Sequence, residues 1–295
     1  MTVVGKKNKS YNLNNLFKKI WDEFVYSGNL LALGDSLVII SLSIILGIQI
    51  TWALPTVVYL SVMAINSYNR YVEYEKDILT NPERSEKIRK YIRSLPYLIV
   101  FLLATSTTIV FMTTTIQALV FMFFLFVLGI FYTIFFKGWT KKVIGFKNFL
   151  IALPYSLMVV FMALYYNNKI SIAVVLVAIF YYGRIFLSAM YFDIKDIDGD
   201  AKEDLKTFAV VFGKGRTTVI LQVINIISFL PLLIAIFLGL IPLYSIGLIL
   251  SIPYTMYYVN KIKDLKSDKS FLYNVVADGE FLFWLPYVLI VKVLL

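Results

Sequence analysis

Carboxylates gathered in two short segments are the side chains of this sequence best suited to chemistry. The two segments hold eleven of the 18 Asp and Glu residues. Within each segment, three oxygen-bearing side chains recur at intervals of three or four residues, which places them on one face of a helix. These side chains are Asn69, Glu73 and Asp77 in the first segment and Asp193, Asp196 and Asp200 in the second.

Two such faces would repel each other strongly if they met, unless cations lay between them. Oxygen-only ligands suit Mg²⁺, which keeps several waters and typically bridges protein carboxylates to the phosphate oxygens of a substrate. We therefore expect a Mg²⁺ site and, through it, a diphosphate. The alternative is that both segments are solvated loops whose acidic charge balances neighbouring lysines. The chain has no Cys and no His, which excludes thiol nucleophiles, Cys/His zinc sites and imidazole bases.

The elements that must position these side chains are membrane helices. Of the 295 residues, 60% are hydrophobic and only 16% are charged, which is too apolar for an ordinary water-soluble domain. A bilayer core of about 30 Å needs roughly 20 apolar residues per helix, and this length predicts an all-α membrane domain of about nine spans. They are expected at 29–51, 53–76, 95–114, 116–137, 148–167, 170–192, 217–239, 241–259 and 272–294, the last interrupted by Asp278 and Glu280.

The basic residues predict how this bundle is oriented. Of the 28 Lys and Arg residues, 23 lie in the N-terminal stretch or in the connections after the second, fourth, sixth and eighth spans, whereas the alternate connections hold only Lys169. This asymmetry places the N-terminus and the basic connections in the cytoplasm. We divide the chain into a basic cytoplasmic lead-in, 1–28, which does not read as a cleavable signal peptide, and a membrane domain, 29–295. Membrane topology explains the net charge of +10, so no nucleic-acid partner is expected.

The second acidic segment, DIKDIDGDAKEDLKTFAVVFGKGRT, resembles a motif of the UbiA superfamily of intramembrane prenyltransferases. That motif reads DxxDxxxD, followed by a Gly, a Lys/Arg-Thr pair and a closing Gly. Asp204 stands where the first glycine is usual. The matching residues are Asp193, Asp196, Asp200, Lys206, Thr207 and Gly213.

The first acidic segment, NRYVEYEKDILTNPERS, is similar to the first motif of the family, NDxxDxxxD followed by Pro-x-Arg. Two positions differ, because Arg70 replaces the second-position aspartate and Glu73 the middle one. Glutamate can still bind a metal through its longer arm, whereas a cation at position 70 would weaken metal binding if it pointed inward. The segment TKKVIGFKN, which ends at Asn148, resembles the basic loop that often precedes the fifth helix. The residues that match the first motif are Asn69, Asp77, Pro82 and Arg84.

The resemblance implies a helical bundle whose active site opens near the cytoplasmic face. There, Glu73, Asp77 and the three aspartates of the second motif would bind Mg²⁺ and hold a prenyl diphosphate, whose isoprenyl group passes to a lipophilic acceptor in the membrane. Arg84 and Lys206 are expected to hold diphosphate oxygens while the allylic C–O bond ionises.

Three further residues are candidates for contact with substrate. Lys141 lies in the basic loop, and the ring of Tyr191 could stabilise a carbocation. Arg184 lies inside an apolar span, where an arginine is costly and so a functional candidate. It would either bind diphosphate or pair with an acidic residue inside the bundle.

The sequence leaves the acceptor open among the aromatic, quinone-precursor, haem and phosphate-bearing molecules that the family uses. It also leaves two other functions open. The altered first motif keeps an intramembrane terpene cyclase in consideration, in which the cation is trapped by its own double bonds. A cation-binding transporter fits less well, because transporter sites usually lie near the midplane of the membrane.

Overall fold

The computed structural model describes residues 13–75, 78, 82–134, 136–262 and 271–295. All regular secondary structure in these ranges is helical, as the sequence predicted. The helices are α1 (Leu13–Tyr26), α2 (Asn29–Leu46), α3 (Ala53–Val72), α5 (Pro82–Arg89), η1 (Ile92–Ser94), α6 (Leu95–Thr113), α7 (Ile116–Ile134), η2 (Phe136–Lys141), α8 (Phe146–Tyr165), α9 (Ile172–Asp193), α10 (Ile197–Lys202), α11 (Phe208–Ile227), α12 (Leu230–Phe237), η3 (Leu243–Leu250), α13 (Ser251–Lys261), η4 (Leu272–Ala277), η5 (Asp278–Phe283) and α15 (Trp284–Leu294).

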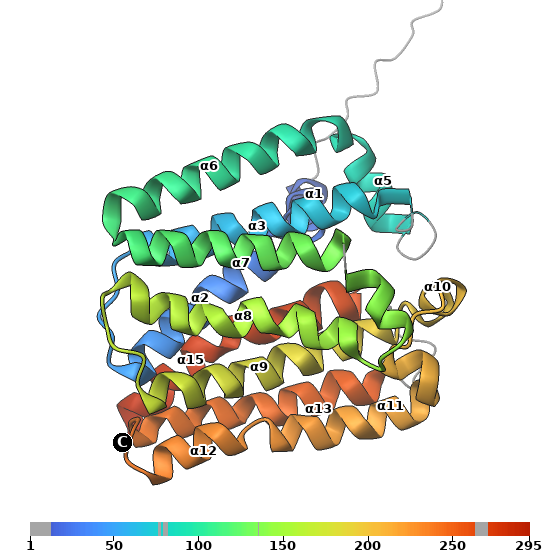
Figure 1. Ribbon diagram of the computed structural model, residues 1–295. Helices are drawn as coiled ribbons and strands as arrows, with labels where there is room; N and C mark the ends of the chain where they lie inside the picture. The colour runs from blue at the N-terminus through green and yellow to red at the C-terminus, as the bar shows by residue number, and fades with distance from the viewer. Residues whose placement is uncertain (1–12, 76–77, 79–81, 135, 263–270) are drawn as a thin grey trace, which may run out of the picture.

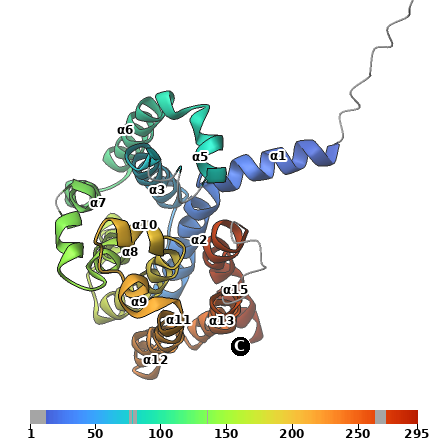
Figure 2. The same cartoon turned by 90° about the vertical axis from the view of Figure 1, so that its right-hand side faces the viewer.

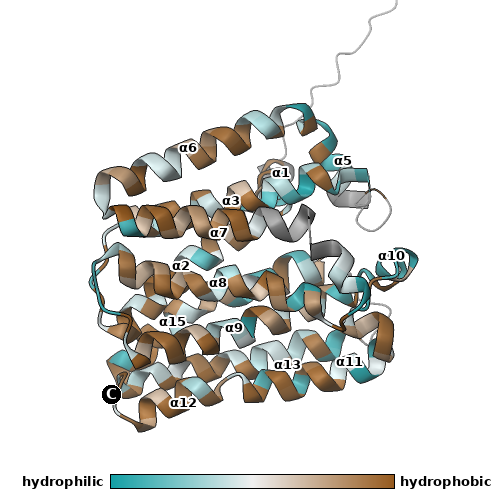
Figure 3. Ribbon diagram, viewed as in Figure 1, coloured by the Kyte–Doolittle hydropathy of each residue, from teal (hydrophilic) through white to brown (hydrophobic). Residues whose placement is uncertain are grey.

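The long helices run side by side as one bundle, and the short helices α1, α5 and α10 gather at one end of it (Figure 1). Figure 2, which looks along the bundle from that end, shows α1 leaving the bundle while α10 stays over it. Apolar residues run along the lengths of the long helices, and α5 and α10 are mainly hydrophilic (Figure 3). The bundle therefore has an apolar middle and a polar end at which both acidic motifs lie.

Six of the nine predicted spans contain described helices that are long and apolar enough to cross a membrane. The protein is accordingly an integral, multi-pass membrane protein. The other three predicted segments are also helical: α3, α7, and η3 with α13. Within the described residues these helices fall outside those limits of length and apolarity, and the apolar stretch of α7, Ile116–Gly129, is too short to meet them. The total of nine spans stays a prediction.

Two of the spans are irregular for identifiable reasons. α11 begins at Phe208, earlier than the predicted 217, because Thr207 caps it by accepting a hydrogen bond from Val210 N at 3.3 Å. Gly213, with φ 74° and ψ 164°, then interrupts the helix. The last span passes from a π-helix, η4, through the 3₁₀-helix η5 into α15. These irregular turns carry the two acidic residues that interrupt this span in the sequence.

The lead-in predicted at 1–28 ends where α2 begins, at Asn29. Most of the described part of the lead-in is itself a helix, α1, and residues 1–12 lie outside the described residues. The division of the chain at residue 28 stays a prediction.

Candidate active site

The second acidic motif forms a buried charge cluster at the polar end of the bundle. Asp193 ends α9 and Asp200 lies in α10, and they are only 2% and 0% exposed. The Lys147 ammonium, from the first turn of α8, lies 2.8 Å from Asp193 Oδ1 and 3.5 Å from Asp200 Oδ2. Asn148 Nδ2 donates to Asp193 Oδ2 at 2.6 Å. Two buried carboxylates therefore lie against one ammonium, and Asp193 also accepts a hydrogen bond from the Asn148 amide.

Backbone contacts between two distant loops hold this cluster in place. Lys206 N donates to Thr140 O, and Gly145 N donates to Lys206 O, each at 2.9 Å. Gly145 adopts φ 70°, and a Cβ added there would lie 2.1 Å from Cε2 of Phe208. Only glycine fits this left-handed, crowded position without displacing the ring. The loop that leads into Lys147 and the loop that follows Asp200 are thus fixed to each other.

The turn after α10 needs a left-handed residue as well. Asp204 has φ 58° and stands at the position where the family motif usually has glycine. Leu205 N donates to Asp200 O at 2.9 Å, so the chain turns back directly beneath the buried aspartate. Aspartate is among the few residues that adopt this conformation at modest cost, which explains why the substitution is compatible with the fold.

The buried carboxylates of the cluster suit a cation. Carboxylates removed from water are costly unless positive charge compensates them, as the Lys147 ammonium does here. Among the described residues, two buried oxygens, Asn148 Oδ1 and Asp196 Oδ1, accept no hydrogen bond, although the Lys195 ammonium lies 3.9 Å from Asp196 Oδ1. Carboxylate and amide oxygens are ligands that Mg²⁺ accepts, so this donor set fits a magnesium ion. Within the described ranges, however, no group of three or more acidic side chains is close enough to hold a metal.

The first motif is only partly described. Asn69 lies in the last turn of α3, Glu73 follows the helix as an exposed residue, and Arg84 lies in α5. Asp77 lies outside the described residues. The convergence of the two motifs on shared metal ions, and the roles of Glu73 and Asp77 as ligands, therefore stay predictions.

Arg70, the unusual cation of the first motif, lies against the junction of α1 and α2. A Cβ on Gly28 would come within 2.7 Å of Arg70 Nη2, so the guanidinium packs directly on that glycine. Burial raises the pKa of Tyr91, the positive charge of Arg70 lowers it, and the negative charge of Glu23 raises it further. These contacts place Arg70 beside α1, and its departure from the family motif is accommodated there.

Three of the predicted substrate-binding residues have simple placements. Lys206 and Lys141 are exposed at the same end of the bundle as the buried cluster. Tyr191 is fully buried, with its ring 4.7 Å from that of Tyr258 and 4.9 Å from that of Tyr273. Its hydroxyl has no hydrogen-bond partner among the described residues.

Of the two roles open to Arg184, the structure shows buried pairing. Its Nη2 donates to Glu280 Oε1 at 2.5 Å and to Thr255 Oγ1 at 2.6 Å, and its Nη1 donates to Asn225 Oδ1 at 2.6 Å. Tyr258 donates to the other oxygen of Glu280 at 2.8 Å. Arg184 also lies nine residues before Asp193 on α9, about 13 Å along the helix. Its guanidinium is therefore committed to holding α9, α11, α13 and η5 together.

Two residues close to Asp193 were not among the predicted site residues. Lys147 and Asn148 end the segment that resembles the basic loop of the family, and this likeness was the signal that could have identified them. A third position, Asp35, is fully buried in α2 and accepts a hydrogen bond from Tyr181 at 2.9 Å. No spacing in the sequence connects α2 with α9, so this contact could not be anticipated.

The fold and the buried cluster define a polytopic membrane protein with acidic residues at the polar end of its bundle. The model of the UbiA prenyltransferase family matches residues 30–285. A digeranylgeranylglyceryl phosphate synthase of Pyrococcus abyssi (strain GE5 / Orsay) is 29% identical over 199 residues, which are 63% of this chain and 67% of that protein.

Two solved structures share the fold at 14% sequence identity. A UbiA homolog from Aeropyrum pernix K1, in its apo form, has a TM-score of 0.65 and is matched over 90% of this chain and 97% of its own. A UbiA homolog from Archaeoglobus fulgidus, bound to DMAPP and Mg²⁺, has a TM-score of 0.62, with 92% and 99% of the two chains covered.

The chain belongs to the UbiA prenyltransferase family. The predicted family, the all-helical membrane fold and the assignment as a prenyltransferase are thereby confirmed. The Mg²⁺ and prenyl diphosphate expected from the sequence are of the kind that the Archaeoglobus fulgidus homolog holds.

Proposed function

We propose that this prenyltransferase moves an isoprenyl group from a prenyl diphosphate to a phosphate-bearing lipophilic acceptor, with Mg²⁺ as cofactor. The observation that carries the proposal is the pair of buried carboxylates, Asp193 and Asp200, which both lie against the Lys147 ammonium. Buried carboxylates at the polar end of an apolar bundle attract divalent cations. Such cations attract a diphosphate, while the apolar bundle accommodates the prenyl chain.

The reaction requires the allylic C–O bond of the donor to break, with its electron pair leaving on the diphosphate. A new bond forms between that carbon and a nucleophilic atom of the acceptor, which loses a proton. Bound Mg²⁺ supplies charge neutralisation of the leaving group. Asn148 orients Asp193 through its 2.6 Å hydrogen bond. Lys206 and Lys141 are exposed at the same end, where they supply positive charge for diphosphate oxygens, and Arg84 of the first motif is assigned the same task.

The ligand set extends to Asn69, Glu73 and Asp77 of the first motif and Asp196 of the second. Asp196 Oδ1 supports this assignment, because within the described residues it accepts no hydrogen bond and has only the Lys195 ammonium at 3.9 Å as an ion-pair partner. The rim of the metal site would then consist of oxygens from the end of α3 and from the α9–α10 turn. Aromatic rings near this rim, such as that of Tyr191, shield the allylic cation from water.

We propose that the bundle is oriented in the membrane with its polar end at the cytoplasmic face. The support is the distribution of basic residues, since Lys18, Lys87, Lys141 and Lys206 all lie on elements at the polar end of the bundle. The opposite end carries Lys169 in the connection between α8 and α9. A strong bias of this kind sets membrane orientation in multi-pass proteins.

The relative from Pyrococcus abyssi supports the phosphate-bearing class of acceptor, because its name specifies the synthesis of a glyceryl phosphate lipid. An acceptor of this class has an apolar chain for the membrane and an anionic head for the lysine-rich polar end. A terpene cyclase would have no need for a second, phosphate-bearing substrate there. It is therefore a distinct outcome of the experiment that tests the proposal.

The test is to incubate the purified protein with labelled geranylgeranyl diphosphate, Mg²⁺ and a panel of acceptors that includes a glyceryl phosphate lipid and 4-hydroxybenzoate. We expect a Mg²⁺-dependent conjugate with the phosphate lipid. Asp193→Asn and Asp77→Asn should lower the rate at least about 100-fold. Asp198→Asn and Glu75→Gln, which change exposed carboxylates in the same two segments, are the matched controls.

Each alternative product contradicts a defined part of the proposal. Conjugation of 4-hydroxybenzoate alone would refute the acceptor class, and a cyclic hydrocarbon without acceptor would show a cyclase. If the rate were unchanged in Asp193→Asn, the buried carboxylates would have no part in the reaction.

A further inference from the structure

The N-terminal helix α1 exposes the apolar side of an amphipathic sequence. Leu16, Phe17, Ile20 and Trp21 are between 47% and 65% exposed, while Lys18, Lys19 and Asp22 occupy the other side of the helix. Figure 2 shows α1 leaving the bundle at its polar end. A helix with this division of side chains, at the polar end of a membrane protein, lies in the interface with its apolar side among the acyl chains.

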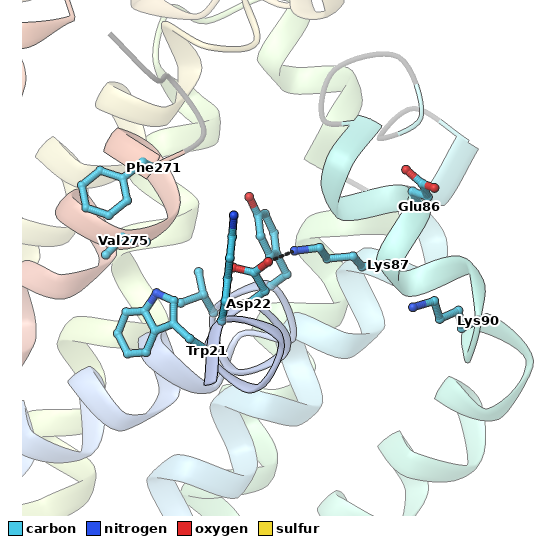
Figure 4. Close-up of a pocket in the computed structure, with 10 residues that line it drawn as sticks. Trp21, Asp22, Glu86, Lys87, Lys90, Phe271 and Val275 are labelled. Carbon is cyan, nitrogen blue, oxygen red and sulfur yellow. Dashed lines mark ion pairs between the residues drawn. The ribbon is translucent and has the colours of Figure 1, made fainter. Parts of the chain in front are cut away.

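A groove opens where α1 meets α5 and η4, and its volume is about 670 Å³. One wall is apolar, with Trp21 of α1 facing Phe271 and Val275 at the start of the last span (Figure 4). The other wall carries three ammonium groups, those of Lys18, Lys87 and Lys90, against the two carboxylates of Asp22 and Glu86. The groove therefore has a hydrocarbon-compatible side and a side with net positive charge.

The three lysines of the groove differ in whether they already have an ion-pair partner. Lys87 pairs with Asp22 at 3.1 Å and lies 3.8 Å from the centre of the Tyr26 ring. Lys18 and Lys90 are exposed, and within the described part of the chain neither has an ion-pair partner. Two ammonium groups of the groove thus remain for an external anion.

We propose that this groove binds an anionic phospholipid from the surrounding leaflet. Lys18 and Lys90 donate to the phosphate, and the upper acyl chain lies along Trp21 and Phe271. The occupant is inferred from charge complementarity together with the adjoining apolar wall, because a soluble anion would make no use of Trp21 and an acyl chain alone would make no use of the lysines. The groove is formed by α1, α5 and η4, so it is separate from the Asp193–Asp200 cluster on α9 and α10, and the inference does not depend on the proposed reaction.

The first test follows Trp21 directly. The protein is reconstituted in nanodiscs that contain phosphatidylcholine and a minor fraction of phosphatidylglycerol, with either lipid brominated near the top of its acyl chains. The fluorescence of Trp21 is obtained as the difference between the wild type and Trp21→Phe. We expect brominated phosphatidylglycerol to quench this component at least about twofold more than the same fraction of brominated phosphatidylcholine. Equal quenching by the two lipids would overturn the proposal.

The second test measures how much Lys18 and Lys90 contribute to the affinity for anionic lipid. Lipid is titrated into detergent-solubilised protein, and the shift in melting temperature gives an apparent affinity. Each basic residue at a membrane surface adds about fivefold to the affinity for anionic lipid, so Lys18→Gln with Lys90→Gln should weaken phosphatidylglycerol binding about 25-fold. The control is Lys169→Gln with Lys292→Gln, which removes the same charge elsewhere on the molecule and should leave the affinity unchanged.

Two further outcomes of this titration would overturn the proposal. Inorganic phosphate that stabilises the wild type as strongly as phosphatidylglycerol would show a site for the free anion rather than for a lipid. An equal loss of affinity in the double variant and in its control would show a general charge effect without a site at the groove.

Discussion

Breaking the Arg184–Glu280 pair tests whether this arginine supports the fold or the substrate. In Glu280→Gln, the guanidinium stays fully buried, at 1% exposure, without a compensating anion. Removing one partner of a buried pair costs about 3–5 kcal/mol. For a domain of this size, 1 kcal/mol corresponds to roughly 2–4 °C, so the melting temperature in detergent should fall by about 6–20 °C.

A double-mutant cycle distinguishes the pair from a simple packing defect. Arg184→Met combined with Glu280→Leu removes both charges and keeps similar volumes, so the double variant should recover most of the lost stability. Lys87→Gln removes one partner of a half-exposed pair and should cost at most about 1 kcal/mol. The assay is thermal unfolding followed by tryptophan fluorescence, with binding of a prenyl diphosphate measured on the same samples. The reasoning is refuted if Glu280→Gln melts within 2 °C of the wild type. If this stable variant also lost donor binding, Arg184 would serve the substrate rather than the fold.

Three further substitutions address the polar end of the bundle. Asn148→Ala removes a buried hydrogen bond to the charged Asp193, worth about 1.5–3 kcal/mol, so kcat should fall about 10- to 100-fold in a donor-turnover assay; an unchanged kcat would show that the carboxylate needs no such support. Gly145→Ala places a methyl group against Phe208 at positive φ and should cost at least about 2 kcal/mol, seen as a lower melting temperature that Phe208→Ala partly restores. Arg70→Gln should keep kcat within about threefold, because the guanidinium packs on Gly28; a large gain in Mg²⁺ affinity would instead place Arg70 at the metal.

Most of the fold follows from the sequence because the physical requirement is simple. A bilayer demands apolar helices of nearly fixed length, and the span predicted at 170–192, for example, is the helix Ile172–Asp193. The early start of α11 could not be predicted in this way. It depends on the hydroxyl of Thr207 and on the freedom of Gly213, which are local effects without an apolar signature.

The candidate site was predictable in its residue types and less so in its contacts. The spacing of Asp193, Asp196 and Asp200 predicted one face of a single helix, and that part was wrong, because α9 ends at Asp193 and α10 begins at Ile197. The structure nevertheless brings Asp193 and Asp200 together at Lys147. That the ammonium of Lys147 lies between them depends on how α8 enters the bundle after Gly145, which no periodicity encodes. For Arg184, the sequence showed that a charge inside a membrane span is costly and needs a partner. It could not show which residue is the partner, because Glu280 lies 96 residues away on another helix.

The backbone hydrogen bond between Lys206 and Thr140 joins two loops at the polar end of the bundle. One of these loops precedes α8 in the sequence and the other follows α9, whereas the short connection between α8 and α9 lies at the far end of the bundle. A chain severed near Asn168 would thus yield two fragments that each carry part of the proposed site: one with Lys147 and the first motif, the other with Asp193 and Asp200. Neither fragment alone could turn over a substrate, and recovered turnover would require the two to reassociate in register. The architecture is therefore suited to a split-enzyme reporter for encounters within a lipid bilayer.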